Sequence, residues 1–193
     1  FEFLEYLGVE PEPVEWNIQL TPEERAAQSA FFAPLGRTCA IVVAGSKVQK
    51  NWAPNRYARV MESLYAEYGM TSILVGGPSE FERDVANRIK ETARVTPIDA
   101  LGDNIRKLVW ILDGASLVIS PHTGPLHIAR ALDRPAIGLY GYTNPKRHSP
   151  YRKYHDLMVD GYAKDQDENY PVNMEYRRDG MLRVTVGAVL ERV

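Results

Sequence analysis

Short apolar segments alternate with segments of helical periodicity along most of this chain, and this alternation restricts the fold more than any other feature. The apolar segments cover residues 39–45, 71–77, 94–98, 117–120 and 135–141. The helical patterns between them cover residues 54–69, 80–92, 103–112 and 125–132. Continuous apolar runs are typical of strands buried on both faces. Strands that alternate with helices predict an α/β fold with a parallel sheet and helices on both of its faces.

The ends of the chain carry weaker patterns. Thr21-Pro22-Glu23-Glu24 is a capping box with proline at the first helical position, and it predicts a helix through about Phe32. We interpret residues 1–37 as an interdomain connector and packing arm, and residues 38–193 as one domain. In that domain, Asp103 is the expected N-cap of the third helix. Beyond Pro145 we expect one more strand at 154–159, a polar loop over 160–180 and a short closing helix.

Composition excludes several classes of function. The chain of 193 residues has a net charge of −2, so it lacks the electrostatic footprint of a protein that binds nucleic acid or an anionic membrane. No apolar run approaches the roughly 20 residues that span a bilayer. The single cysteine, Cys39, cannot form an intrachain disulfide or a thiolate metal site, which is typical of a reducing cytoplasm. Because the chain begins with Phe1 and shows no signal pattern, we expect it to be part of a longer cytoplasmic protein.

The loop HTGP lies between an apolar strand and a helix, where ligands of open parallel sheets bind. The first amides of a helix have no intrahelical partner, and the helix dipole there favours an anion. Thr123 supplies a hydroxyl, and Gly124 lets the backbone approach a phosphate closely. The pattern fits equally well with Thr123 as a simple N-cap and Gly124 as a tight turn.

Two other strand-end loops carry candidate ligand contacts. Lys47 and Lys50 follow the first strand; loop lysines are mostly solvated, but Trp52 could anchor this loop so that one ammonium reaches a diphosphate. The glycine pair ending at Gly77 could simply terminate the second strand. With Glu80 just beyond it, a carboxylate that binds ribose hydroxyls is the alternative.

Several familiar sites are missing from the sequence. Neither GxGxxG nor GxxxxGK[ST] occurs, so a dinucleotide fingerprint and a P-loop are both lacking. His122 and His127 are five residues apart, which does not place both on one helix face and argues against a metal site from this pair. His127 alone could be a buried structural histidine or a phosphate partner in the first helical turn. No Ser-His-Asp order or carboxylate pair indicates a catalytic base.

Four segments together resemble the ADP-heptose:lipopolysaccharide heptosyltransferases, glycosyltransferase family 9. They are GSKVQKNWAPNRYARV, LVGGPSEFE, VISPHTGPLHIARALDRPAIGLYGYTNP and MLRVTVGAVLERV. Any one of these segments alone would be weak evidence of a relationship. Four of them in this order, at the ends of strands, are specific to the family. The resemblance runs from about Cys39 to the C-terminus. It implies the GT-B architecture, with residues 38–193 as the Rossmann-like half that binds the nucleotide-sugar donor and ends in a C-terminal helix.

The resemblance also implies roles for individual residues. Lys50 is expected to contact the donor diphosphate, with phosphate binding by Thr123, Gly124 and His127 near the helix start. Glu80 is expected to meet the nucleoside, with Gly77 beside it. The family is inverting and metal-independent, so we expect no cofactor beyond the donor, ADP-heptose. Its general base is an acidic residue of the N-terminal domain, so this chain offers no catalytic base. The acceptor, a lipopolysaccharide core or another glycan, is expected to bind through that domain, with at most peripheral contact at the inner face of the inner membrane.

One position departs from the family pattern. Where relatives have Asp before Ser/Thr-Gly, this chain has His122, expected to meet the sugar. A neutral imidazole offers one acceptor where a carboxylate offers several. Three alternatives therefore stay open: a transferase for a different sugar, a non-catalytic Rossmann-like module that binds a nucleotide, and a dehydrogenase-type domain. The missing glycine fingerprint disfavours the last of these.

Overall fold

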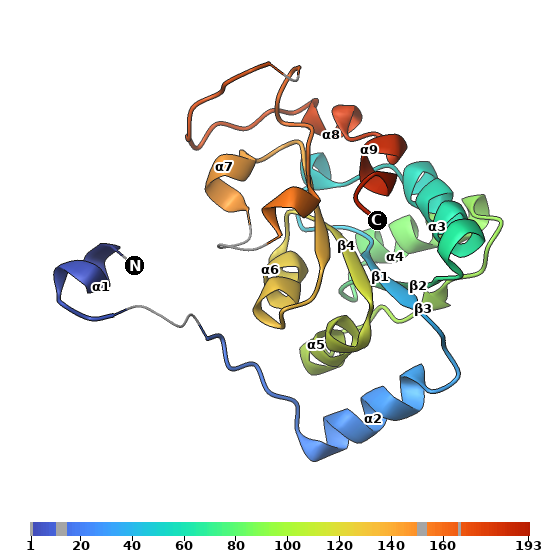
Figure 1. Cartoon of the computed structure of the whole chain (residues 1–193). Helices are drawn as coiled ribbons and strands as arrows, with labels where there is room; N and C mark the ends of the chain where they lie inside the picture. The colour runs from blue at the N-terminus through green and yellow to red at the C-terminus, as the bar shows by residue number, and fades with distance from the viewer. Residues whose placement is uncertain (1, 11–14, 150–153, 166) are drawn as a thin grey trace.

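Six parallel strands form one sheet in the computed structural model, which describes residues 2–10, 15–149, 154–165 and 167–193 (Figure 1). The strands are β1 Thr38–Val42, β2 Thr71–Val75, β3 Ile98–Asp99, β4 Leu117–Pro121, β5 Ala136–Tyr140 and β6 Met158–Asp160. Their order across the sheet is β3-β2-β1-β4-β5-β6. The chain moves outward from β1 to β3, then returns to place β4 on the other side of β1. This reversal of strand order is the switch point at which Rossmann folds bind ligands. The predicted α/β fold with a parallel sheet is confirmed.

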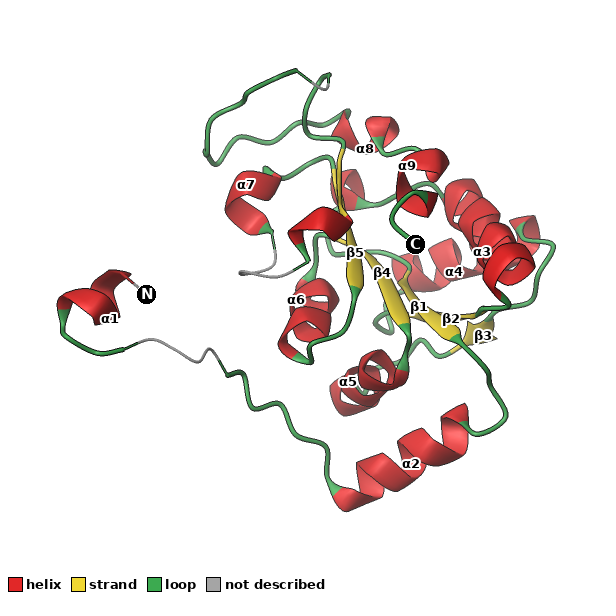
Figure 2. Ribbon diagram, in the orientation of Figure 1, coloured by secondary structure: helices red, strands yellow, loops and turns green. Residues whose placement is uncertain are grey.

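Helices cover both faces of the sheet (Figure 2). The helices of the described residues are α1 Glu2–Tyr6, α2 Pro22–Phe32, α3 Pro54–Tyr68, α4 Glu80–Thr92, α5 Ile105–Gly114, α6 Gly124–Ala131, α7 Pro145–His148, α8 Gly180–Arg183 and α9 Val186–Leu190, with 3-10 turns η1 Val48–Lys50 and η2 His155–Leu157. Helix α1 lies apart from the sheet (Figure 2). Alternate residues of β1 face opposite layers: Cys39 and Ile41 pack with α3, α4, α8 and α9, whereas Ala40 and Val42 pack with α2, α5 and α6. All five residues of β1 are buried, as the apolar run predicted.

The segment before the sheet contains two helices. The capping box at Thr21 is present, and α2 ends at Phe32 as predicted. The ring of Phe31 packs edge-on against Trp110 of α5, 5.4 Å between centroids, and Gln28 donates a hydrogen bond to the Trp110 carbonyl. Helix α2 therefore packs against the domain that follows it. Helix α1 was not predicted, and its apolar side chains, including Phe3, are exposed.

Three predicted details are wrong. The strand expected at 154–159 is only Met158–Asp160, because His155–Leu157 form the 3-10 turn η2. The strand expected at 94–98 is only Ile98–Asp99, because Pro97 has no N–H to donate to the ladder. The N-cap of α5 is Asn104 and not Asp103: the Asn104 side chain accepts a hydrogen bond from the amide of Lys107. The polar segment between β6 and α8 is irregular, as expected, and the closing helix is α9.

Candidate nucleotide-binding site

A pocket of about 920 Å³ opens at the carboxyl edge of the sheet, over the switch point. It is lined by the loops that follow β1, β2, β3 and β4, together with the start of α6. Of the site residues predicted from the sequence, those that line the pocket are Lys50, Gly77, His122, Thr123 and Gly124. Residues far apart in the sequence thus meet where the topology predicts a ligand.

The loops after β1 and β4 touch at Gly45. A Cβ at this position would lie 2.3 Å from Cγ2 of Thr123, so only glycine allows this approach. Asn51 holds the loop closed: its Oδ1 accepts a hydrogen bond from the Gly45 amide at 2.7 Å, and its Nδ2 donates to the Gly45 carbonyl at 3.2 Å. Sequence reasoning missed both residues, although a glycine directly after a buried strand was a usable signal.

Thr123 occupies the N-cap position of α6, but its side chain makes no capping hydrogen bond to the helix. The Thr123 hydroxyl lies 3.3 Å from Oγ of Ser120 and 3.3 Å from the carbonyl oxygen of Pro121, and so faces the loop instead of the amides of α6. Gly124 is exposed, and open space surrounds the position of a Cβ there. Pro125 has no N–H, and the Leu126 amide donates to the Thr123 carbonyl at 3.2 Å, so the Gly124 amide is the one left for an anion in the first turn of α6.

Lys50 connects the two sides of the switch point. Its Nζ donates a hydrogen bond to the carbonyl oxygen of His122 at 3.3 Å. Partial burial lowers the pKa of Lys50, and the neighbouring charge of Lys47 lowers it further. The ammonium is thus partly desolvated at the pocket wall, a place where an anionic ligand would compensate its charge.

His122 lies at the centre of a cluster of rings. Its Nδ1 is 2.8 Å from Oγ1 of Thr143, and its ring stacks on Tyr140 with 5.4 Å between centroids. The ring of His127 meets it edge-on at 5.4 Å, and that of His148 lies at 4.8 Å. Helical spacing predicted that His122 and His127 would not share one helix face, but their rings meet because His122 precedes α6. His148, which the short helix α7 carries, was not singled out in the sequence, although it ends the loop GYTNPKRH that follows the fifth strand.

The His122 imidazole is neutral at pH 7. Burial lowers its pKa to about 3, and the positive charge of Lys50 acts in the same direction. The pKa values of His127 and His148 are lowered too, first by desolvation and then by nearby cations, among them Lys50. Over the described residues, no group of three or more His, Cys, Asp or Glu side chains is placed to hold a metal ion.

The loop after β2 lines the other end of the pocket. Here Glu82, and not Glu80, is a lining residue; Glu80 is exposed at the start of α4. The carboxylate of Glu82 accepts hydrogen bonds from the Gly77 amide at 2.8 Å and from the Ser79 hydroxyl at 2.6 Å. The Ser-x-x-Glu capping pattern in the sequence was the signal for Glu82. His127 likewise stands outside the lining and reaches the site through the ring of His122.

Comparison with known proteins identifies the family. The model of glycosyltransferase family 9 (heptosyltransferase) matches residues 2–174. The chain belongs to this family. It is 28% identical over 169 residues to the lipopolysaccharide core heptosyltransferase OpsX of Haemophilus influenzae, a match that covers 87% of this chain and 48% of that protein. It is 29% identical to lipopolysaccharide heptosyltransferase 1 of Escherichia coli, covering 82% of this chain and 44% of that protein.

Solved structures of glycosyltransferase family 9 share the fold. The family 9 enzyme of Veillonella parvula superposes with a TM-score of 0.77 at 20% identity, over 99% of this chain and 56% of that one. The E. coli heptosyltransferase WaaC with ADP gives a TM-score of 0.65 at 21% identity, over 98% and 52%. The chain spans about half the length of the relatives it matches, and its fold is that of one half of a GT-B glycosyltransferase. Among the described helices, none is long and apolar enough to cross a bilayer.

Proposed function

We propose that this chain is the donor-binding half of a heptosyltransferase, which transfers heptose from ADP-heptose to a lipopolysaccharide core. The observation that carries the proposal is the single pocket that runs from the β2 loop to the start of α6, with Lys50 at one end and Glu82 at the other. Its 920 Å³ matches the size of cavities that bury ligands such as nucleotides. Family membership supports the same substrate class.

In this proposal the nucleoside lies on the β2 side and the diphosphate over the switch point. Lys50, Thr123 and the Gly124 amide surround the diphosphate. Gly77 and Glu82 then face the nucleoside, and His122 lies next to the sugar. Glu80 and His127, outside the lining, keep their predicted roles only if the loops rearrange around the donor.

The reaction we propose is a single displacement that inverts the anomeric carbon. A hydroxyl of the acceptor forms a bond to that carbon while the bond to the ADP oxygen breaks, and ADP leaves with the bonding electrons. The acceptor proton passes to an acidic residue outside this chain. Lys50 and the Gly124 amide stabilise the negative charge that grows on the leaving diphosphate, which lowers the barrier without a metal ion. We propose a cytoplasmic enzyme with at most peripheral membrane contact.

Calorimetric titration of the full-length protein with ADP, UDP and NAD tests this proposal. We expect ADP to bind most tightly. Failure of every nucleoside diphosphate to bind would remove the proposal, and tighter binding of NAD than of ADP would favour a dehydrogenase-type domain.

His122 supports a second candidate, a nucleotide-binding module without transferase activity or a transferase of another sugar. A sugar site built around a neutral imidazole has fewer acceptors than one built around a carboxylate. Incubation of the full-length protein with ADP-heptose and a lipopolysaccharide core separates these candidates: nucleotide binding without transfer of heptose would favour the second.

A further inference from the structure

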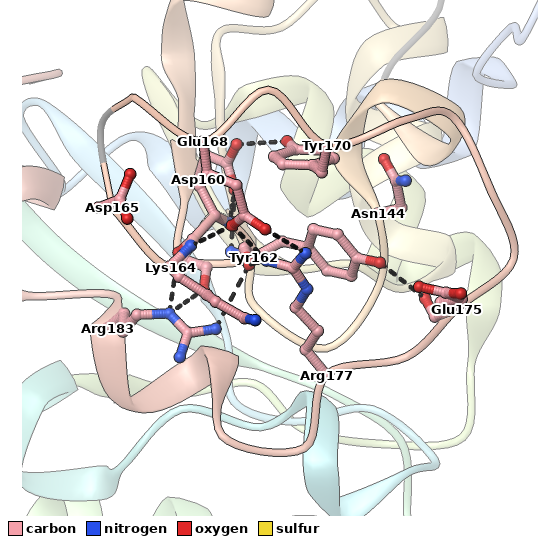
Figure 3. A network of polar contacts seen from close by, with 12 residues as sticks. Asn144, Asp160, Tyr162, Lys164, Asp165, Glu168, Tyr170, Glu175, Arg177 and Arg183 are labelled. Atoms are coloured by element: carbon pink, nitrogen blue, oxygen red, sulfur yellow. Dashed lines mark hydrogen bonds and ion pairs between the residues drawn. The ribbon is translucent and has the colours of Figure 1, made fainter.

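The irregular segment 161–179, between β6 and α8, is held by a polar network (Figure 3). Arg177 donates to both carboxylate oxygens of Glu168, at 2.6 and 2.7 Å, and its guanidinium lies 4.2 Å from the centroid of the Tyr162 ring. The hydroxyl of Tyr170 donates to Asp160 at 2.5 Å. A loop of this length without regular structure is usually functional when it belongs to a compact domain.

The same segment is attached to the loop that follows β5. Tyr176 pairs with Thr143 as an antiparallel bridge, and the Arg177 amide donates to the Tyr142 carbonyl at 3.0 Å. The buried side chain of Asn144 donates to the carbonyl of Pro171 at 2.8 Å. Residues 171–177 thus add a short stretch of chain alongside the β5 loop, at the ligand-binding edge of the sheet.

This attachment places two tyrosine rings face to face. The rings of Tyr142 and Tyr176 lie 4.8 Å apart with an angle of 11° between their planes. Tyr176 is 47% exposed, and the ammonium of Lys47 lies 5.3 Å from the centroid of its ring. We call these three residues, Lys47, Tyr142 and Tyr176, the aromatic platform. Exposed tyrosine rings that are held in place, with a polar group beside them, are typical of binding surfaces.

The platform adjoins the diphosphate end of the pocket by two routes. Lys47 is the N-cap of η1, and the last residue of this turn, Lys50, lines the pocket. On the other side, Thr143 follows Tyr142 in the chain and its hydroxyl is 2.8 Å from the His122 ring. The nucleoside end lies across β1, toward β2 and β3. A ligand that extends from the diphosphate toward β5 therefore reaches the platform with its sugar.

We propose that the aromatic platform is a subsite for a pyranose ring, an inference that rests on the proposed function. The apolar C–H face of the sugar packs on the exposed part of Tyr176, and the ammonium of Lys47 donates hydrogen bonds to its hydroxyls. The ring belongs either to the heptose of the donor or to the saccharide that accepts it. The network around Arg177 fixes the platform before the sugar arrives, so little side-chain entropy is lost on binding.

Two measurements on the full-length protein test the subsite: calorimetric affinity for ADP and ADP-heptose, and the KM for a lipopolysaccharide core saccharide. The variants are Tyr176→Ala, Tyr176→Phe and Lys47→Ala. Tyr65→Ala is the matched control, because Tyr65 is an exposed tyrosine of α3 at 59% exposure. For Tyr176→Ala we expect ADP affinity within twofold of the unsubstituted protein and a loss of about tenfold for the sugar, the effect of one lost ring contact.

The pattern of losses identifies the source of the sugar. Weaker ADP-heptose binding assigns the platform to the donor, whereas unchanged ADP-heptose binding with a raised acceptor KM assigns it to the acceptor. Tyr176→Phe should keep the affinity, since the ring remains, and Lys47→Ala should lose about threefold without a change in folding. The subsite is wrong if Tyr176→Ala and Lys47→Ala both match Tyr65→Ala, or if ADP binding falls as far as sugar binding. If the unsubstituted protein binds neither ADP nor ADP-heptose, the proposed function fails, and the subsite with it.

Discussion

Two regions of the molecule bring residues to the same edge of the sheet by different means. Around β1 and β4, buried apolar strands fix the backbone, and the loops between them approach closely because Gly45 has no side chain. Around β5 and β6, the irregular segment 161–179 is fixed by hydrogen bonds and ion pairs of polar side chains. The first region forms the pocket in which we propose that the diphosphate binds, and the second carries exposed tyrosines. Apolar packing thus positions the proposed phosphate site, whereas a polar network positions the neighbouring surface.

The largest expected effect lies in the first region. Lys50→Ala should weaken ADP binding by about 1.5–3 kcal/mol, or roughly 10- to 150-fold, the range for a hydrogen bond to a charged group. Lys47→Ala is the matched control, since it removes the same charge from the same loop but at an exposed position outside the pocket lining. Titration calorimetry of the full-length variants measures both. Equal losses would mean that only the general charge of the loop matters, and the distinction between pocket and platform would disappear.

In the second region, the stability of the irregular segment should depend on single polar side chains. Asn144 is 1% exposed; its Oδ1 accepts from the Lys146 amide, and its Nδ2 donates to Pro171 and Asn173. Asn144→Ala should therefore lower the free energy of unfolding by about 2 kcal/mol, because buried partners lose their hydrogen bonds. Hydrogen exchange should rise over 167–179 while the exchange of β1 and β4 stays unchanged.

The exposed Asn169 gives a control for this variant. Its side chain accepts one hydrogen bond from Lys146, and Asn169→Ala should change stability by less than about 0.5 kcal/mol. If hydrogen exchange in Asn144→Ala rose uniformly across the sheet, the two regions would unfold together. That result would contradict our expectation that the segment 167–179 opens independently of β1 and β4.

His122 lies where the two regions meet, and its replacement tests which of them it serves. His122→Asp should leave ADP affinity within about threefold and change the preference among ADP-sugars, because a carboxylate accepts hydrogen bonds that the neutral imidazole cannot. His122→Asn is the control, similar in reach but uncharged. Loss of ADP binding in both variants would make His122 a phosphate or structural residue, and would move it into the first region.

The difference between the regions also explains what the sequence could predict. Apolar runs and helical periods can be read locally, so the pattern predicted the strands and the loops that follow them, including the loop of Thr123. The choice of Lys50 over Lys47 came from the family resemblance, and the strand order came from the structure. The contacts of Arg177 with Glu168, or of Tyr142 with Tyr176, have no such period. They depend on how an irregular loop folds back, which no local pattern records.

The site residues that were misassigned or overlooked were missed for the same reason: their positions depend on how a short turn or loop folds. Glu80 and Glu82 are both plausible carboxylates in the sequence, and the choice depends on which one turns toward Gly77 through the Ser79 cap. His148 reaches the site because α7 is only four residues long and leaves its last side chain beside His122. In both cases, which side chain faces the pocket depends on the geometry of a single helical turn. The spacing of residues in the sequence does not resolve positions this finely.

The smallest effect is a pH dependence of stability that originates in the histidine cluster. The pKa of His122 is about 3 in the folded chain and 6.5 when unfolded, so the unfolded state binds the extra proton between these values. Stability from this group is therefore complete above pH 6.5 and decreases as the pH falls through that window. Between pH 7.5 and 5.5 the loss should be about 1 kcal/mol, allowing for partial exposure of the ring. His127 and His148, whose pKa values are also lowered, add to it with the same sign.

Thermal unfolding at pH 7.5 and 5.5 measures this loss, with His122→Asn as the comparison. In that variant the difference between the two pH values should shrink, since the residue no longer titrates. The carboxylates with lowered pKa values, such as Asp99, lose their stabilisation only at more acidic pH, so they do not obscure the window. If the variant keeps the full pH dependence, the ring of His122 is not desolvated by Tyr140 and Thr143. The contact that joins the pocket to the platform would then be too loose to position either one.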